Sequence, residues 1–472
     1  MEKRDVVVYS EDYKKLVDAT ALKDKYYEID ERVEEICKEA FKGCDKLEEI
    51  VMPKKLKKID SEAFQGCSSL TKLTLPDSVA SIGRWAFQGC SGLTELTLPD
   101  SVTIIGDGAF QGCSGLTELT LPNCVRVVEA CAFKDCSGLT KLTLPNSVTS
   151  IADDAFSGCS GLTKLTLPSR VASIGRWAFY GCSGLTELTL SNSLVSIGGN
   201  AFSWCSGLEK IMVESGNSRY DSRDNCNSII ETETNTLIAG CKNSIIPNSV
   251  TSIGDSAFEG CTGLTELTLP NSVTSIGDSA FGWCSELTEL TLPNSVKSIG
   301  ESAFSGCSGL TELTLPDSLK SIDGSVFSGC SSLTKLTLPN SLESIGEHAF
   351  SDCRGLTELT LPNSVASIGN GAFGGCSGLT ELTLPNSVTS IGDAAFSECS
   401  GLSKITSLAG IPPVCGFKVF NGVNKTNCEL IVPIVSVIAY KLAEVWNEFS
   451  NIRGFSGVEV TVADKTRKIV VE

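Results

Sequence analysis

One phrase of 23 residues recurs through most of this chain and is clearest at residues 67–89, CSSLTKLTLPDSVASIGRWAFQG. Fifteen units contain the pair Phe-x-x-Cys, and their cysteines run from Cys44 to Cys399. The step between these cysteines is always 23 residues except from Cys205 to Cys261, where it is 56, or 23 plus an insertion of 33. A constant period of this size predicts a solenoid of stacked units, each of which packs only on its neighbours.

The two halves of the unit predict different local structure. In the first half the leucines are spaced L-x-x-L-x-L, and their alternation predicts a short, half-buried strand that Pro76 ends. In the second half Gly83 lies where a turn can require a positive φ. The side chains expected to point inward from this half are Val79, Ile82, Ala86, Phe87 and Cys90. No unit can bury its apolar face alone, so the core must form by stacking.

The period and the leucine spacing together predict the fold class. A period of 23 residues lies within the range of leucine-rich repeats. We therefore expect a leucine-rich repeat solenoid of about fifteen 23-residue units, with a curved parallel sheet on the concave face. Because each unit needs only its neighbours, the whole chain can form one elongated domain, and we expect a monomer.

The full pattern LxxLxLPxSVxxIGxxAFxxC is almost unbroken at residues 261–283 and 376–398. It resembles the BspA-type leucine-rich repeat of surface proteins from host-associated bacteria and protists, including Bacteroides-type members. The resemblance covers roughly residues 27–409. It implies a protein-binding or adhesive solenoid, secreted or at the cell surface, whose ligand is a protein such as a host matrix component or glycoprotein.

Departures from the repeat predict the domain boundaries. In the insertion, Ser228–Ile230 and Leu237–Ala239 flank the polar turn TETNT, which predicts a hairpin protruding from the stack. Near the end, Ser436 is a candidate N-cap for a helix whose apolar face runs from Val437 to Phe449. The expected segments are an N-terminal cap (1–26), repeats (27–213), the hairpin insertion (214–246), repeats (247–409), a C-terminal cap with a helix (410–453) and a short β tail (454–472), which forms two strands or begins a further domain.

Charge and hydropathy exclude two classes of partner. The chain has 38 Lys and Arg against 56 Asp and Glu, a net charge of −18, and such a field repels nucleic acid. No run of about 18 apolar residues exists to span a membrane. The apolar patch Val6–Tyr9 is too short for a signal peptide, so either the protein works where it is made or a signal was removed.

Nothing in the sequence predicts an enzyme or a cofactor. The one histidine, His348, occupies a variable repeat position, where a general base is not expected. Asp221, Asp224 and Asn225 would suggest calcium, but the spacing lacks the alternating ligands and the distal glutamate of a calcium loop, which favours an Asx-rich surface turn. No C-x-x-C pair predicts zinc.

Most of the 22 cysteines belong to the repeat. Fifteen recur at one inward position, where we expect free, buried thiols that fill the core. The other seven are Cys37, Cys124, Cys131, Cys226, Cys241, Cys415 and Cys428. Two pairs among these, Cys226 with Cys241 and Cys415 with Cys428, would each close a short loop if they formed disulfides, and the sequence leaves both states open.

The outward positions of the predicted strands supply candidate protein-binding residues. One column is nearly all threonine, and the column beside it mixes glutamate with lysine. The candidate acidic residues in that column are Glu266, Glu289, Glu312, Glu358 and Glu381. Like charges on adjacent strands are unfavourable, so an acidic strip kept there suggests a basic partner. The other interpretation is a soluble, strand-compatible surface without a ligand.

Four tryptophans are the second set of candidates. They are Trp85, Trp177, Trp204 and Trp283, and they occupy positions that usually hold small or polar residues. Exposed tryptophans often mark contact sites, and the competing interpretation is local packing between units. Together with what the family resemblance implies, these features favour a non-catalytic, adhesin-like binding module. The alternatives are an intracellular scaffold, which abundant thiols and the missing signal would suit, and a structural spacer.

Overall fold

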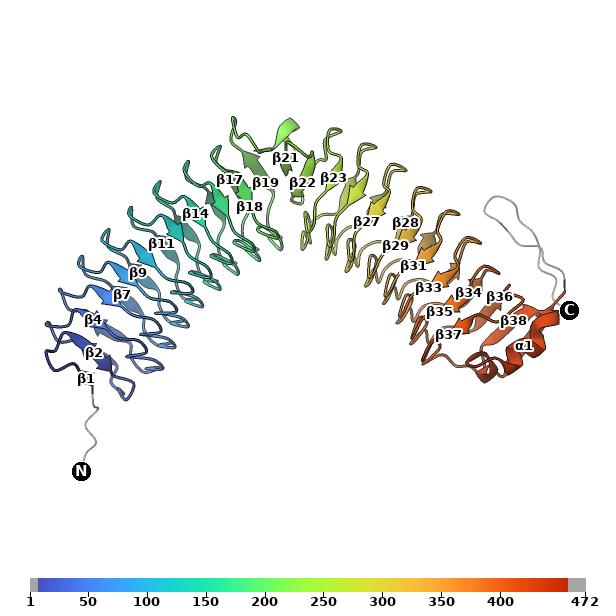
Figure 1. Cartoon of the computed structure of the whole chain (residues 1–472), viewed down its shortest axis with the longest axis horizontal. Helices are drawn as coiled ribbons and strands as arrows, with labels where there is room; N and C mark the ends of the chain where they lie inside the picture. The colour runs from blue at the N-terminus through green and yellow to red at the C-terminus, as the bar shows by residue number, and fades with distance from the viewer. Residues whose placement is uncertain (1–6, 457–472) are drawn as a thin grey trace, which may run out of the picture. The chain divides into compact units, whose positions relative to one another are not determined.

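The computed structural model describes residues 7–456, and all 22 cysteines lie within them (Figure 1). By its internal contacts the chain divides into two compact units. Unit 1 comprises Met1–Glu233 and Ala239–Ser244, and unit 2 comprises Thr234–Ile238 and Ile245–Glu472. Each unit is a stack of coils built from very short strands, which confirms the solenoid. The described residues form about 19 turns, more than the fifteen predicted, because coils without the Phe-x-x-Cys pair also belong to the stacks.

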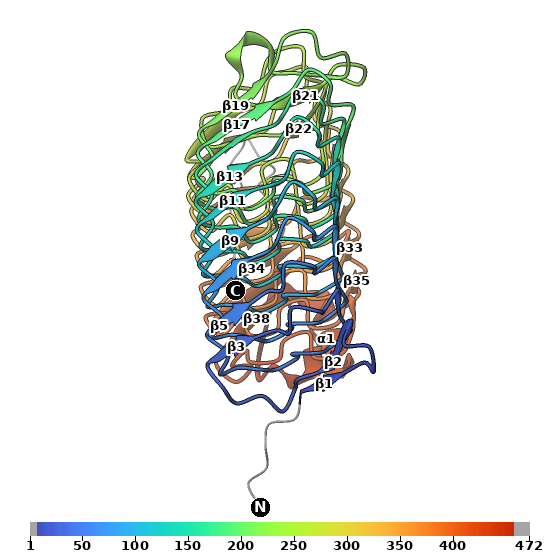
Figure 2. The same cartoon turned by 90° about the vertical axis from the view of Figure 1, so that its left-hand side faces the viewer.

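Unit 1 contains two ladders of strands, which are parallel except that the first strand of the second ladder pairs antiparallel with its neighbour. The leucine strands of the first ladder are β3 (Tyr26–Glu28), β5 (Glu49–Val51), β7 (Lys72–Thr74), β9 (Glu95–Thr97), β11 (Glu118–Thr120), β13 (Lys141–Thr143), β15 (Lys164–Thr166), β17 (Glu187–Leu190) and β19 (Lys210–Val213). The second ladder contains β1 (Val8–Tyr9), β2 (Lys15–Asp18), β4 (Glu35–Ile36), β6 (Lys58–Ile59), β8 (Ser81–Ile82), β10 (Ile104–Ile105), β12 (Val127–Val128), β14 (Ser150–Ile151), β16 (Ser173–Ile174) and β18 (Ser196–Ile197). Figure 2 shows β3, β5 and β9 on the opposite side of the coils from β1 and β2.

Unit 2 repeats this plan. Its leucine ladder contains β24 (Glu266–Thr268), β26 (Glu289–Thr291), β28 (Glu312–Thr314), β30 (Lys335–Thr337), β32 (Glu358–Thr360), β34 (Glu381–Leu384), β36 (Lys404–Ser407), β38 (Glu429–Pro433) and β39 (Asn451–Phe455). Its second ladder contains β22 (Thr236–Ala239), β23 (Ser252–Ile253), β25 (Ser275–Ile276), β27 (Ser298–Ile299), β29 (Ser321–Ile322), β31 (Ser344–Ile345), β33 (Ser367–Ile368), β35 (Ser390–Ile391) and β37 (Val414–Cys415). Residues 23 apart lie opposite each other, as Leu359 does Leu382, so the sequence period is the register of the ladder.

Stacked phenylalanine rings form the centre of each core. Phe41 and Phe64 have ring centroids 4.8 Å apart and planes within 7°, and this stacking continues from coil to coil. Beside the rings, the repeat cysteines are free and buried, as predicted. Most of these thiols also make a hydrogen bond that the sequence did not predict: Cys67 Sγ donates to the Phe41 carbonyl at 3.1 Å, and the same bond recurs one coil later.

The turns correct one prediction about glycine. The φ of Gly83 is not positive. A larger residue is excluded at this position by lack of space, because a Cβ there would lie 2.5 Å from the backbone nitrogen of Ser61. Left-handed backbone instead occurs at two other positions of each 23-residue repeat. Trp85 (φ 54°) and Gly89 (φ 73°) represent these two positions. Close approach of adjacent coils, and not turn geometry, therefore explains the glycine in the Ile-Gly phrase.

The insertion contributes short strands to both units. In unit 1, β20 (Tyr220–Asp221) and β21 (Ile229–Glu231) pair antiparallel, on either side of the 3₁₀ turn η1 (Arg223–Asn225). In unit 2, β22 pairs with β23 in parallel, with Leu237 opposite Ile253. This strand therefore continues the second ladder of unit 2.

The C-terminal coil is covered by short helices. The apolar face expected from Val437 to Phe449 is divided between α1 (Val437–Leu442) and the 3₁₀ turn η3 (Trp446–Glu448), after a 3₁₀ turn η2 (Ile434–Ser436). The chain leaves the helix at Ala443, whose backbone is extended, and turns back so that Trp446 packs against Phe420 with centroids 5.3 Å apart. The strands expected in residues 457–472 lie outside the described residues. No helix within residues 7–456 is long and apolar enough to cross a membrane.

Candidate functional site

The five candidate glutamates project from the leucine ladder of unit 2. In each strand the central leucine points into the core, as Leu290 does with 7% exposure, so the flanking glutamate and threonine point to solvent. The register places Glu266 opposite Glu289 on adjacent strands, and Glu358 opposite Glu381. Two pairs of like charges therefore lie along this face.

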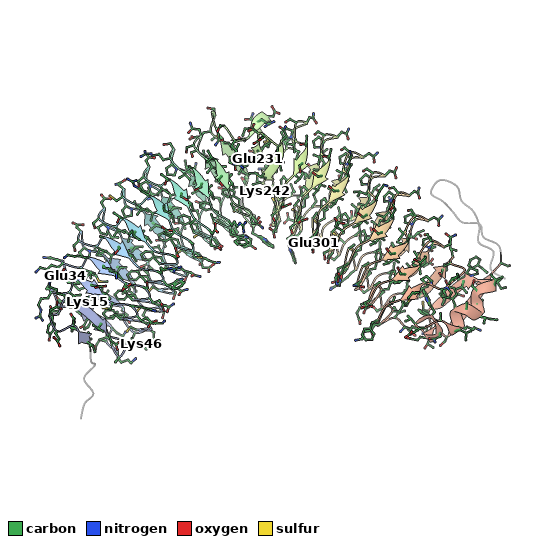
Figure 3. All side chains as sticks on the ribbon, in the orientation of Figure 1. Lys15, Glu34, Lys46, Glu231, Lys242 and Glu301 are labelled. Atoms are coloured by element: carbon green, nitrogen blue, oxygen red, sulfur yellow. The ribbon has the colours of Figure 1, made fainter. Side chains whose placement is uncertain are left out.

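Ion pairs neutralise much of the glutamate and lysine column elsewhere. In unit 1, Glu95 lies 2.8 Å from Lys72, and Glu187 lies 2.7 Å from Lys164. The second ladder shows the same pairing between coils, with Lys15 2.8 Å from Glu35 and Glu34 in contact with Lys57; Figure 3 labels Lys15 and Glu34. Pairing between successive coils is thus the common state of these columns.

The five candidate glutamates of unit 2 are paired with lysine less completely than this. Glu312 pairs with Lys335 at 3.0 Å and Glu381 with Lys404 at 3.3 Å. Glu266, Glu289 and Glu358 make no ion pair with any residue in 7–456. Since like charges on adjacent strands repel, the strip carries uncompensated negative charge at Glu266 and Glu289.

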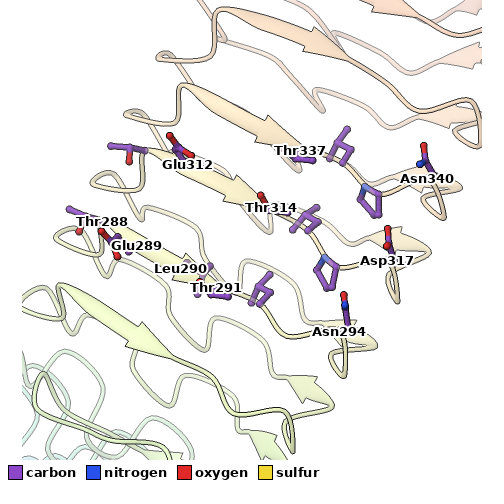
Figure 4. A pocket seen from close by; sticks show the side chains of 16 residues that line it. Thr288, Glu289, Leu290, Thr291, Asn294, Glu312, Thr314, Asp317, Thr337 and Asn340 are labelled. Atoms are coloured by element: carbon purple, nitrogen blue, oxygen red, sulfur yellow. The ribbon is translucent and has the colours of Figure 1, made fainter. Parts of the chain in front are cut away.

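A groove of about 740 Å³ opens beside this strip, over β26, β28 and β30. Figure 4 shows Glu289 and Glu312 near the starts of their strands, while Asn294, Asp317 and Asn340 lie in the turns beyond the strand ends. The intervening outward positions are threonines, Thr291, Thr314 and Thr337. Two of the five predicted glutamates therefore line a groove, while Glu266, Glu358 and Glu381 lie along the same ladder on either side of it.

The polar side chains of the groove lining offer several hydrogen-bond acceptors. The hydroxyls of Thr291, Thr314 and Thr337 make no hydrogen bond to any other described residue, so each can bond to a ligand. Carboxylates at one end and Asx side chains at the other suit donors such as lysine and arginine side chains and backbone N–H groups. The sequence analysis did not select the Asx residues, although the recurrent Pro-Asx-Ser phrase after each strand was a signal for them.

The tryptophans lie in the turns and not in the groove. Trp85, Trp177 and Trp283 are 37%, 43% and 54% exposed, and Trp204 is half-buried. All four have a positive φ of 53–61°. Two indoles cover a glycine of the next coil: Trp85 lies over Gly108 and Trp283 over Gly306, where a Cβ would come within 2.4 Å and 2.8 Å of the ring. Exposure and packing between coils therefore coexist at these positions.

The remaining candidates show ordinary surface or core environments. His348 lies at an exposed turn, 3.8 Å from Glu347. Asp221 pairs with Arg223 at 2.7 Å, and no cluster of three metal-ligating side chains occurs among residues 7–456. Cys226 and Cys241 are free thiols that donate to the backbone carbonyls of Ser228 and Asn227, and Cys415 and Cys428 are also free.

Comparisons with known proteins agree with this architecture. The family model described as "BspA type Leucine rich repeat region (6 copies)" matches overlapping segments 22–140, 128–236, 228–357 and 320–423. A leucine-rich cell surface protein from Faecalibacterium prausnitzii is similar, with 26% identity over 85% of this chain and 92% of its own, and a TM-score of 0.50. A leucine-rich repeat protein from Eubacterium ventriosum has 24% identity over 73% of this chain and 83% of its own, with a TM-score of 0.53. No curated protein matches.

The chain is a leucine-rich repeat solenoid. This class is defined by its stacked 23-residue coils, its buried Phe and Cys columns, and its outward Glu and Thr columns. Since the matched segments run from residue 22 to residue 423, the chain belongs to the BspA-type leucine-rich repeat family. The resemblance inferred from the sequence pattern is thereby confirmed.

Proposed function

We propose that this protein is a non-catalytic, adhesin-like binding module, secreted or displayed at the cell surface, that holds basic segments of partner proteins in the groove over β26, β28 and β30. The observation that carries this proposal is the uncompensated charge of Glu266 and Glu289 next to the groove. Most other glutamates of the column pair with a basic side chain of an adjacent coil, so the unpaired Glu266 and Glu289 mark a surface where a ligand can supply the positive charge.

The surface location is supported by similarity to a bacterial cell surface protein. The four turn tryptophans are proposed as a second set of contacts, because half-exposed indoles offer apolar area with a hydrogen-bond donor at its edge. One observation favours an intracellular scaffold as the second candidate: all 22 cysteines are free thiols, a state typical of reducing compartments.

Binding of the immobilised full-length chain to a panel of matrix proteins and glycoproteins tests the function. We expect basic members to be retained and acidic members of similar size to pass, with retention weakened by salt. Retention of both groups alike, or of neither, would contradict the proposal, and the second result would favour a structural spacer. Trypsin treatment of intact cells tests location: the surface protein is cleaved, whereas an intracellular scaffold survives until lysis.

A further inference from the structure

A second groove lies in unit 1, where one coil departs from the repeat consensus at several positions. The coil at 122–129 reads PNCVRVVE, whereas the unit at 76–83 reads PDSVASIG. Cys124 replaces a serine, Arg126 a small residue, Val127 a serine and Glu129 a glycine. In a repeat protein the fixed positions are required by stacking, so outward substitutions concentrated in one coil indicate a local role.

These substituted side chains line one groove of about 560 Å³. Its lining includes Ile104 from the preceding coil and Arg170, which replaces the serine of a later coil. Ile104 and Val127 are 57% and 36% exposed, although the same position is serine in most other coils. Two guanidinium groups and two branched aliphatic side chains thus face one space, together with the single carboxylate of Glu129.

The second ladder is interrupted at this groove. On one side Thr103 N donates to the Ala80 carbonyl at 3.0 Å, and on the other Thr149 N donates to the Arg126 carbonyl at 2.8 Å. Within residues 7–456, no backbone hydrogen bond joins β10 to β12. A side-chain hydrogen bond between coils is lost as well. Ser101 Oγ donates to the Val79 carbonyl at 2.6 Å, and Cys124, at the same repeat position, has no equivalent bond in the part of the chain described. The substitutions therefore coincide with a break in the hydrogen bonding of the second ladder between two successive coils.

The guanidinium groups in this groove are not neutralised by the protein. Arg84, in the same unit, lies 2.6 Å from Asp107, and Arg219 lies 3.0 Å from Glu231. Arg126 and Arg170 make no ion pair with any described residue, although the chain has a net charge of −18. Unpaired arginines in an acidic protein are suited to bidentate binding of carboxylates supplied by a ligand.

We propose that this groove binds an extended segment of another protein in which acidic residues alternate with aliphatic ones. The carboxylates pair with Arg126 and Arg170, and the aliphatic side chains cover Ile104 and Val127. The proposal is independent of the acidic groove in unit 2, because its ligand has the opposite charge.

Fluorescence anisotropy with the full-length chain and a fluorescein-labelled peptide of alternating glutamate and valine tests this proposal. Arg126→Glu and Arg176→Glu change the net charge equally, but Arg176 is exposed outside the groove and makes no ion pair with described residues. We expect Arg126→Glu to weaken binding by on the order of tenfold or more, with Arg176→Glu close to wild type. Circular dichroism would verify that both variants remain folded.

Cys124 provides a second readout, since it is the one exposed cysteine among residues 7–456. Bound peptide should slow its reaction with a maleimide, and a peptide of alternating lysine and valine should not. Equal binding by the two arginine variants, absence of binding, or preference for an oligonucleotide or an anionic vesicle over the glutamate peptide would overturn the proposal.

Discussion

Glu266 and Glu289 lie opposite each other on adjacent strands without a lysine between them, whereas Glu95 in the same column lies 2.8 Å from Lys72. Replacement of glutamate by lysine should therefore have opposite effects on stability at positions 289 and 95. Glu289→Lys creates a pair with Glu266 and should stabilise the chain by about 0.2–1 kcal/mol. Glu95→Lys replaces the ion pair with Lys72 by two like charges on adjacent strands and should destabilise the chain. Urea unfolding of both variants measures the signs, and a shift in the same direction for both would contradict the assigned pairing.

Burial of the thiol column predicts sensitivity to alkali. Burial raises the pKa of Cys136, Cys307 and Cys353 to about 12, whereas an unfolded thiol titrates near pH 8.5. Between these values the unfolded state loses a proton that the folded state keeps. The free energy of unfolding should therefore be unaffected by these thiols below about pH 8.5 and fall by about 1.4 kcal/mol per pH unit for each thiol above it.

Urea unfolding across that pH range measures the slope, and Cys136→Ala provides the control for other titrating groups. The variant should show a shallower alkaline slope than the wild type, by about the contribution of one thiol. Identical slopes for the two chains would show that Cys136 does not titrate on unfolding.

Close approach of coils predicts which glycines cannot be replaced. Gly83→Ala places a Cβ 2.5 Å from the Ser61 nitrogen, and the backbone there must move. We expect a loss of about 1–3 kcal/mol in urea unfolding. Gly199 is the matched control, since its Cβ would meet nothing within 4 Å, and Gly199→Ala should be close to neutral. Equal effects of the two substitutions would contradict close approach of coils as the constraint on Gly83.

The phenylalanine stack predicts a large effect at its middle. Phe133 lies 5.5 Å from Phe110 and 5.6 Å from Phe156 between ring centroids, and it is fully buried. Phe133→Ala should cost about 3–5 kcal/mol in unit 1. Phe417 is 70% exposed, so Phe417→Ala should change stability little. Comparable losses in thermal unfolding would contradict the stacking of Phe133 as the main source of its stabilisation.

The repeat made much of the fold predictable. Because residues 23 apart occupy the same place in successive coils, the sequence located the strands, the Phe and Cys columns and the outward glutamates. The sequence could not show why glycine occupies position 83, because a positive φ and a close approach of neighbouring backbone both favour glycine. It also underestimated the number of turns, since terminal coils and the insertion form strands without the Phe-x-x-Cys pair.

The grooves could be predicted only in part. Glu289 and Glu312 were found from their column, but the adjoining space depends on the distance between coils, which a perfect repeat does not encode. At the second groove, Arg126, Val127 and Arg170 were visible as departures from the consensus. Their convergence on one groove became clear only from the structure, because it depends on how successive coils are spaced.

The most direct test of the proposed binding surface is the dissociation constant of the full-length chain for a fluorescein-labelled polylysine peptide. The double variant Glu289→Lys and Glu312→Lys alters the groove of unit 2. The matched double variant Glu95→Lys and Glu118→Lys changes net charge equally in the same column of unit 1, where lysines already pair with both glutamates. We predict a loss of affinity of about tenfold or more for the first variant and less than about twofold for the second. Equal losses in the two variants, or no loss in the first, would contradict the acidic groove as the binding surface.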